Sequence, residues 1–306
     1  MTHTHHAHDG HDHAPKNFDR AFAVGVLLNT GFVAVEVTFG VLSNSLSLLA
    51  DAGHNFSDVL ALLLAWGASV LARKPPTQRH TYGLRRSSVL AALVNAVVLL
   101  VAVGAIAWEA VLRFGHPETV DSAVVMGVAS VGIAINGFTA WLFMSGKKDD
   151  VNVMGAYMHM AADAAVSLGV VMAAVLMQFT GWLWLDPVMS LSIAVVIGVG
   201  TWGLLRESLN LALDAVPAKI QPTHVEAYFL SLPGVVGLHD LHIWAMSTTE
   251  IALTVHLVKA DTVLDDALLA RINHDVRAQF DIHHTTVQFE TGNPAHPCQQ
   301  APAEVL

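Results

Sequence analysis

The chain has 306 residues, of which 54% are hydrophobic and 13% are charged, and its mean hydropathy is +0.52. Soluble domains carry about 25% charged residues, so this composition argues against a soluble protein and indicates a membrane protein. The formal net charge of −10 argues against a nucleic-acid-binding surface. The single cysteine, Cys298, excludes both an intramolecular disulfide and a zinc finger built on thiolates.

The N-terminal segment, residues 1–17, is polar and rich in histidine: six of the 18 histidines lie in the first thirteen positions. It has no short apolar region followed by a small-residue cleavage site, so it does not resemble a signal peptide. Thr, Ala, Asp and Gly interrupt the histidines, whereas a purification tag is usually unbroken. We therefore expect a disordered, metal-binding tail.

Six apolar stretches follow. A helix needs about 20 apolar residues to cross a bilayer core of about 30 Å, and each stretch is long enough. The predicted spans are residues 18–42, 46–71, 87–114, 120–144, 151–179 and 185–205. Residues 18–208 are therefore expected to form an all-α bundle of six transmembrane helices.

The loops between these spans predict the orientation of the bundle. Basic residues are concentrated in alternate connections, which the positive-inside rule places in the cytoplasm. Both termini are then cytoplasmic, as the even number of spans also requires. The basic residues concerned are Arg73, Lys74, Arg79, Arg85 and Arg86, then Lys147 and Lys148, then Arg206 and Lys219.

The composition becomes that of a soluble domain after about residue 209. Residues 223–232 and 264–280 are predicted helices, and residues 235–244, 251–258 and 285–289 are predicted strands. The order α-β-β-α-β is typical of a small α+β layer in which helices cover one face of a sheet. Residues 209–292 are expected to form this domain, and residues 293–306 a disordered tail.

Two membrane spans carry the same motif, H-x-x-x-D. The second span holds His54 and Asp58, and the fifth holds His159 and Asp163. Residues four apart lie on one face of a helix, so each span projects an imidazole and a carboxylate in one direction. If the two spans face each other, the four side chains converge.

Two imidazoles and two carboxylates suit a tetrahedral divalent metal site such as that of Zn²⁺. Their net charge of −2 would neutralise the ion in the bilayer. A single histidine in a span often serves only as a hydrogen bond between helices, but ionisable groups at this depth cost about 2.5–3.5 kcal/mol each. Two identical pairs therefore favour a metal site, and Asp51, three residues before His54, is expected to support its ligands or line the pathway.

With these motifs the chain resembles the cation diffusion facilitator family, in particular its zinc-transporting members. The resemblance covers residues 18–292 and lies in SLSLLADAGHNFSD, TYG-x-x-R at residues 81–86, the second H-x-x-x-D pair, LHDLHIWAMS, LTVHLV and TTVQFE. It implies a homodimeric antiporter that exports Zn²⁺ against incoming H⁺, with a ferredoxin-like, metallochaperone-like cytoplasmic domain. Within the family, histidine at the position of His54 goes with zinc, and aspartate with broader zinc and cadmium use.

The C-terminal domain offers a second group of possible ligands. His239 and His242 would point to opposite faces of a regular strand, so the predicted same-face set is His239, His256, His283 and Glu290, which also matches the family's cytoplasmic ligands. The alternative is a set of solvated surface histidines. Gln288 stands where some relatives carry a histidine, which argues against a two-metal site. His296 and Cys298 are candidates to donate to the site of a partner subunit.

A third candidate is weaker. His80, in the loop after the second span, matches one ligand of a loop site in some relatives, but Thr77 and Leu84 occupy the other positions and ligate poorly. Among the polar residues of the spans (Asn29, Glu36, Asn95, Glu109 and Asn136), helix packing is the simplest role. Glu36 is the most costly at depth, and a place facing the cavity is its alternative.

Protons compete with metal for the ligands, because ligands must be deprotonated, so exchange of Zn²⁺ for H⁺ by alternating access is the predicted function. Co²⁺, Ni²⁺ or Cd²⁺ as the main substrate is an alternative, since affinity alone does not select zinc. A membrane metal sensor is the alternative from another class. A metalloenzyme is disfavoured because four protein ligands leave no position for water. The expected location is a bacterial inner membrane.

Overall fold

The computed structural model describes residues 16–116, 118–144, 151–260 and 266–301. The described residues fall into two compact units, one formed by those up to residue 59 together with those of 101–198, and the other by those of 60–100 together with those from residue 199 onward. Most of the predicted N-terminal tail, Lys147, Lys148 and the last five residues lie outside the described part of the chain.

The six predicted membrane helices are present, with ends within a few residues of those expected. They are α1 (Lys16–Leu42), α2 (Leu46–Ala72), α3 (Ser87–Gly115), α4 (Ser122–Phe143), α5 (Val151–Thr180) and α6 (Leu185–Ala212). Among the described residues, α2 to α6 each contain a segment long and apolar enough to cross a membrane, and α1 contributes the shorter apolar stretch Leu27–Leu42. The chain is therefore a multi-pass membrane protein.

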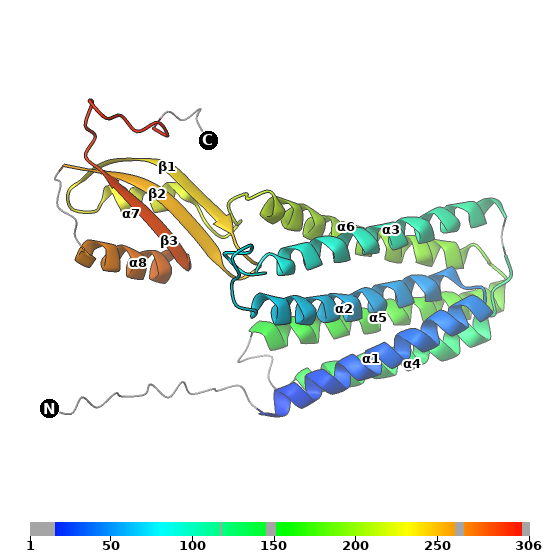
Figure 1. Ribbon diagram of the computed structural model, residues 1–306. Coiled ribbons are helices and arrows are strands. Elements are labelled where there is room, and N and C mark those ends of the chain that lie inside the picture. The colour runs from blue at the N-terminus through cyan, green and yellow to red at the C-terminus, as the bar shows by residue number, and fades with distance from the viewer. Residues whose placement is uncertain (1–15, 117, 145–150, 261–265, 302–306) are drawn as a thin grey trace. The chain divides into compact units, whose positions relative to one another are not determined.

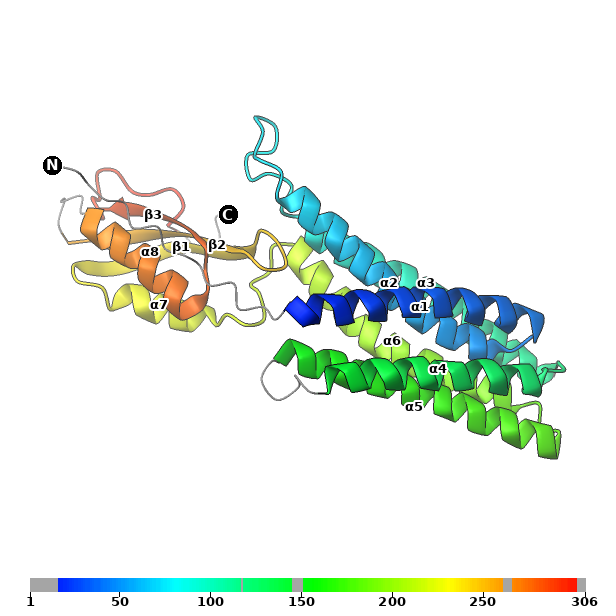
Figure 2. The same cartoon turned by 90° about the horizontal axis from the view of Figure 1, so that it is seen from below.

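In the first unit, α4 lies between α1 and α5 and packs along both (Figures 1 and 2). Phe32, Leu48 and Val128 form a buried cluster there. Gly132 of α4 is required for this packing, because a β-carbon at its position would come within 2.8 Å of the Phe32 ring and 3.1 Å of Ser167 Oγ.

The start of α2 is held by a carboxylate from another helix. Asp186, in the first turn of α6, is fully buried. It accepts hydrogen bonds from the Leu46 amide at 2.8 Å and from the Ser45 and Ser47 hydroxyls at 2.6 Å each. A carboxylate at a helix N-terminus satisfies free amides and complements the helix dipole. This contact fixes the end of α2 that precedes His54 and Asp58.

The second unit contains the C-terminal domain, with α7 (Pro222–Leu230), β1 (Val235–Ala245), β2 (Ile251–Lys259), α8 (Asp266–Phe280) and β3 (His284–Glu290). This order confirms the predicted α-β-β-α-β layer. The sheet has the order β1-β2-β3, with β1 antiparallel and β3 parallel to β2, and α7 and α8 cover one of its faces (Figure 2).

Alternation along β2 divides the sheet into an apolar face and a polar face. Leu253, Val255 and Leu257 are completely buried, in one core with Phe229 of α7 and Ile272 of α8. The side chains between them, at even positions that include His256, point to the other face. The core therefore leaves the histidine-bearing face free of helices in the described domain.

Candidate metal centre

Four predicted ligands converge in the first unit. His54 and Asp58 of α2 and His159 and Asp163 of α5 each offer one ligand atom, and these atoms all lie within 4.8 Å of one another. We call these four residues the intramembrane cluster. Each helix supplies one imidazole and one carboxylate from adjacent turns, as the four-residue spacing predicts.

The four side chains pair across the two helices. Nε2 of His54 lies 3.2 Å from Oδ1 of Asp163, and Nε2 of His159 lies 3.1 Å from Oδ2 of Asp58. The two imidazole rings meet edge to face, with centroids 5.8 Å apart. Nε2 of each histidine is thus within reach of a carboxylate oxygen that could share the same ion or proton.

The intramembrane cluster is buried on one side and accessible on the other. The Asp163 side chain is 1% exposed and His159 is 40% exposed. Within the described residues, Nδ1 of His54 and Oδ2 of Asp163 are buried without a hydrogen-bond partner. A buried polar atom without a partner is costly, and a divalent cation beside Asp163 would satisfy its free oxygen. Two nitrogen and two oxygen donors with a charge of −2 suit such an ion.

Asp51 lies beside the intramembrane cluster but is not among its four ligand residues. It is fully buried, and its Oδ2 accepts a hydrogen bond of 3.0 Å from Ser167 Oγ. Ser167 follows Asp163 by one turn on α5. Asp51 is therefore tied to α5 one turn away from Asp163.

A second cluster lies on the polar face of the sheet. His239 of β1, His256 of β2, Glu290 of β3 and Cys298 each offer a ligand atom within 4.8 Å of the others. We call it the sheet cluster. Nδ1 of His256 lies 3.0 Å from Oε1 of Glu290 and 3.6 Å from the Cys298 sulfur, and Nε2 of His239 lies 3.4 Å from Oε2 of Glu290.

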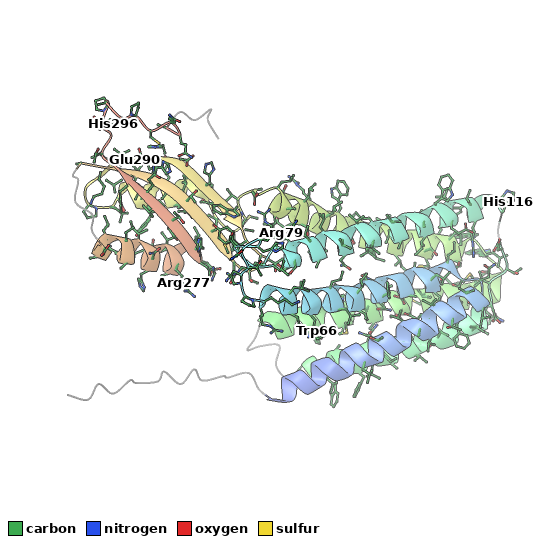
Figure 3. All side chains as sticks on the ribbon, viewed as in Figure 1. Trp66, Arg79, His116, Arg277, Glu290 and His296 are labelled. Carbon is green, nitrogen blue, oxygen red and sulfur yellow. The ribbon has the colours of Figure 1, made fainter. Side chains whose placement is uncertain are left out.

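Strand register brings three of these side chains together. His239 pairs directly with His256, and Glu290 pairs with Val258, two residues further along β2. The segment after β3 then turns back, as the positions of Glu290 and His296 in Figure 3 show. It closes a cavity of about 640 Å³ lined by His239, Glu290, His296 and Cys298.

A bulge in β1 changes the expected position of His242. The register shifts between His239 and His242, and Asp240 there has a φ of 52°. The extra residue places His242 opposite Thr254, on the same face as His256. Asp240 then bridges the two histidines, 2.9 Å from His242 Nε2 and 3.4 Å from His256 Nε2. The prediction that His239 and His242 point to opposite faces of the strand is therefore wrong. His242 nevertheless lies outside the sheet cluster.

The other predicted ligands lie elsewhere. Nε2 of His283 lies 3.5 Å from Oδ1 of Asp281. Among the described residues, Cys298 takes the place predicted for His283 as the fourth member of the sheet cluster. His80 is exposed in a tight turn, where its amide bonds to Thr77 Oγ1 at 3.0 Å, and among the described residues it belongs to neither cluster.

Electrostatics in the sheet cluster favour an ionised Glu290. Burial raises the pKa of this carboxyl, but hydrogen bonds from Cys298 and Gln288 and the neighbouring His239 and His256 lower it by more, so the pKa lies below its ordinary value. For Cys298, a backbone hydrogen bond at Gln300 lowers the pKa, while burial and the hydrogen bond to Glu290 raise it overall. A metal ion would have to displace the thiol proton to bind here.

Two family models match this chain. The model described as "Cation efflux transmembrane domain" covers residues 22–211, and "Cation efflux protein, cytoplasmic domain" covers residues 217–292. The chain belongs to the cation diffusion facilitator, or cation efflux, family. Members of this family are metal-ion transporters rather than enzymes.

Named relatives are similar in sequence to this chain over nearly its whole length. The metal cation efflux system protein CzcD of Cupriavidus metallidurans is 37% identical, over 96% of this chain and 92% of its own length. The zinc transporter ZitB of Escherichia coli is 36% identical over 97% and 94%. The cadmium, cobalt and zinc/H(+)-K(+) antiporter of Bacillus subtilis is 32% identical over 92% of each chain.

Proposed function

We propose that this cation efflux protein is a proton-coupled antiporter that exports divalent cations, chiefly Zn²⁺, from the cytoplasm by alternating access around the intramembrane cluster. The crossed pairing of His54 with Asp163 and of His159 with Asp58, at 3.2 and 3.1 Å, carries this proposal. Relatives named as zinc transporters and as a metal/H(+)-K(+) antiporter support it.

Exchange of metal for protons follows from the chemistry of the four ligands. Zn²⁺ requires neutral imidazoles and ionised carboxylates. When the ion leaves, the same imidazoles can take up protons and pair with the carboxylates that face them. Because protons and Zn²⁺ compete for the same atoms, a difference in pH between the two sides of a membrane can drive the exchange. The cluster then holds either the ion or protons in each half of the cycle.

The preference for zinc rests on His54. With this residue the cluster offers two nitrogen and two oxygen donors, a set that zinc accepts and that hard, oxygen-preferring ions such as Mg²⁺ and Ca²⁺ do not favour. Co²⁺, Ni²⁺ and Cd²⁺ are the competing substrates within the same mechanism.

The sheet cluster is proposed as a structural or regulatory zinc site in the cytoplasm. His239, His256, Glu290 and Cys298 would hold the ion, with the soft thiolate favouring Zn²⁺ over harder ions. We further propose that the protein works as a homodimer in a bacterial inner membrane, with both termini in the cytoplasm.

The test is to reconstitute the purified protein in liposomes with one dye for zinc and another for pH. An antiporter moves zinc and protons in opposite directions, and dissipation of the pH gradient stops zinc accumulation. Zinc binding without flux would instead support a metal sensor, and zinc flux without proton movement would refute the coupling. Competition by Co²⁺, Ni²⁺ and Cd²⁺ in the same assay ranks the substrates.

A further inference from the structure

A cavity of about 740 Å³ lies within the second unit. It is lined by the end of α2, the start of α3, the loop that joins these helices in Figure 1, one residue of α6 and the segment 247–250 of the C-terminal domain. No member of the intramembrane cluster or of the sheet cluster is among the described lining residues. Ligand sites commonly have volumes of about 300–1,000 Å³, so the cavity is large enough for a ligand that the transport mechanism does not require.

The inner walls of the cavity are apolar and belong to membrane helices. The residues that form them are small or aliphatic: Ala61 and Leu64 of α2, Ala91 and Ala92 of α3, and Leu204 of α6. Ala61 lies eleven residues before the end of α2 at Ala72, and a helix rises 1.5 Å per residue, so the cavity extends along α2 by about 16 Å. A bilayer core is about 30 Å thick, so the cavity reaches the depth of lipid acyl chains.

The mouth of the cavity is basic. Arg73 and Lys74 directly follow α2, are exposed and line the cavity, and Arg85 lies just before α3. Among the described lining residues only Glu250 is acidic, and it pairs with Arg85. Arg73 and Lys74 have no acidic partner in the part of the chain that the structure describes. The mouth therefore carries positive charge that a bound anion can neutralise.

A buried polar side chain lies deeper in the same cavity. Asn95 of α3 is 5% exposed, lines the cavity, and has an Oδ1 atom that is buried without a hydrogen-bond partner among the described residues. It lies about 10 Å further along α3 than Ser88 at the mouth. A buried amide without a partner is costly, and an amide can both donate and accept. Asn95 therefore has hydrogen-bonding capacity that the polar groups of a bound molecule can use.

We propose that this cavity binds one anionic phospholipid, with the phosphate at Arg73 and Lys74 and an acyl chain along α2 and α3. Basic pockets between membrane helices bind anionic head groups, and the ester groups of a phospholipid lie between its phosphate and its chains, on the side of the phosphate where Asn95 lies. A free phosphate ion would meet the basic mouth but leave the apolar walls uncovered. With the proposed orientation of the protein, the lipid comes from the cytoplasmic leaflet.

The lipid would contact two parts of the second unit at once. The amide of Thr248 donates a hydrogen bond of 3.1 Å to Ser88 Oγ at the start of α3, and both residues line the cavity. A ligand that binds only the folded protein stabilises it. An anionic phospholipid should therefore raise the melting temperature of the protein in detergent. This inference does not depend on the proposed antiport.

Native mass spectrometry of the full-length protein in detergent tests the site by counting bound lipids. Phosphatidylglycerol, which is anionic, is compared with phosphatidylcholine, which has no net charge, with the same acyl chains. The wild type should bind one phosphatidylglycerol per chain at concentrations where phosphatidylcholine does not bind.

Removal of the two free cations should weaken this binding. Each basic residue near an anionic head group contributes about fivefold to affinity, so Arg73→Gln combined with Lys74→Gln should bind phosphatidylglycerol about 30-fold more weakly. Arg79→Gln combined with Arg206→Gln is the matched control. It loses the same charge from exposed residues that are not among the described lining residues, and it should bind as the wild type does.

A second variant tests the apolar walls while the basic mouth stays intact. Ala92→Phe places a ring in the space proposed for the acyl chain, so binding of phosphatidylglycerol should fall. Ala102→Phe is its control, because Ala102 is exposed on α3 and is not among the described lining residues, and it should leave binding unchanged.

Three results would overturn the inference. Equal binding of both lipids, or unchanged binding after loss of Arg73 and Lys74, would show lipid that merely surrounds the protein. Displacement of the lipid by an equal concentration of inorganic phosphate would show a site for soluble anions. Lipid binding that survives Ala92→Phe while the variant changes from dimer to monomer would show that a second copy of the chain covers the cavity.

Discussion

Nε2 of His54 on α2 lies 3.2 Å from Oδ1 of Asp163 on α5, although 109 residues separate them in the chain. The reciprocal pair, His159 and Asp58, is equally close at 3.1 Å. Neither helix alone holds a complete set of ligands, so the intramembrane cluster exists only while α2 and α5 stay together. A movement that separates these helices would break it, which links ion release to conformational change.

Replacement of His54 by aspartate should change which metal is carried. His54→Asp removes one of two nitrogen donors and raises the ligand charge from −2 to −3, which weakens the preference for ions that favour imidazole. We expect cadmium to compete with zinc more effectively than in the wild type. The measurement is zinc uptake by proteoliposomes over a range of cadmium concentrations. The same competition curve in both proteins would show that His54 does not set the selectivity.

Loss of the thiol should alter the sheet cluster. In Cys298→Ser the bound zinc loses its only sulfur ligand, so X-ray absorption at the zinc edge should lose a Zn–S distance of about 2.3 Å. Zinc affinity at this site should fall by at least about tenfold. His274→Ala is the matched control, because His274 is exposed on α8 and should leave the spectrum intact. A wild-type spectrum that contains no sulfur would refute the role of Cys298.

Removal of one charge should weaken the N-terminal end of α2. Oδ1 of Asp186 accepts hydrogen bonds from the Ser45 and Ser47 hydroxyls, and Oδ2 accepts one from the Leu46 amide. Asp186→Asn replaces one of these two acceptor oxygens by an amide nitrogen that donates. A hydrogen bond to a charged group is worth about 1.5–3 kcal/mol, and a loss of this size should lower the melting temperature of the protein in detergent.

Glu118→Gln is the control for Asp186→Asn, because it removes the charge of a half-exposed glutamate that pairs with Arg113. Its melting temperature should stay near that of the wild type. Equal melting temperatures for Asp186→Asn and the wild type would mean that this buried carboxylate does not hold α2 in place.

Periodicity explains how much of this fold could be predicted. Apolar runs of membrane length predict α1 to α6, and alternation at Leu253, Val255 and Leu257 predicts β2 as a half-covered strand. The four members of the intramembrane cluster could be predicted for the same reason, because the spacing of His54 and Asp58 is a property of one helix. Patterns of this kind are local and therefore visible in the sequence.

Features that depend on tertiary contact could not be predicted in the same way. The bulge at Asp240 changes which face His242 occupies, and nothing in LHDLHIW marks the extra residue. Cys298 reaches His256 through a turn in a segment expected to be disordered. The hydrogen bond from Asn55 to Glu36 joins different helices, so their separation of 19 residues carries no signal.

Zinc flux through Asp163→Asn is the most direct test of the intramembrane cluster as the transport site. This variant keeps the size of the buried side chain but removes one of two ligand charges, so zinc transport in proteoliposomes should fall by at least about 100-fold. Asp121→Asn is the control, because it loses a charge at the exposed N-cap of α4, where asparagine also caps, and it should transport normally. Zinc transport at the wild-type rate by Asp163→Asn would contradict the assignment of these four residues as the transport site.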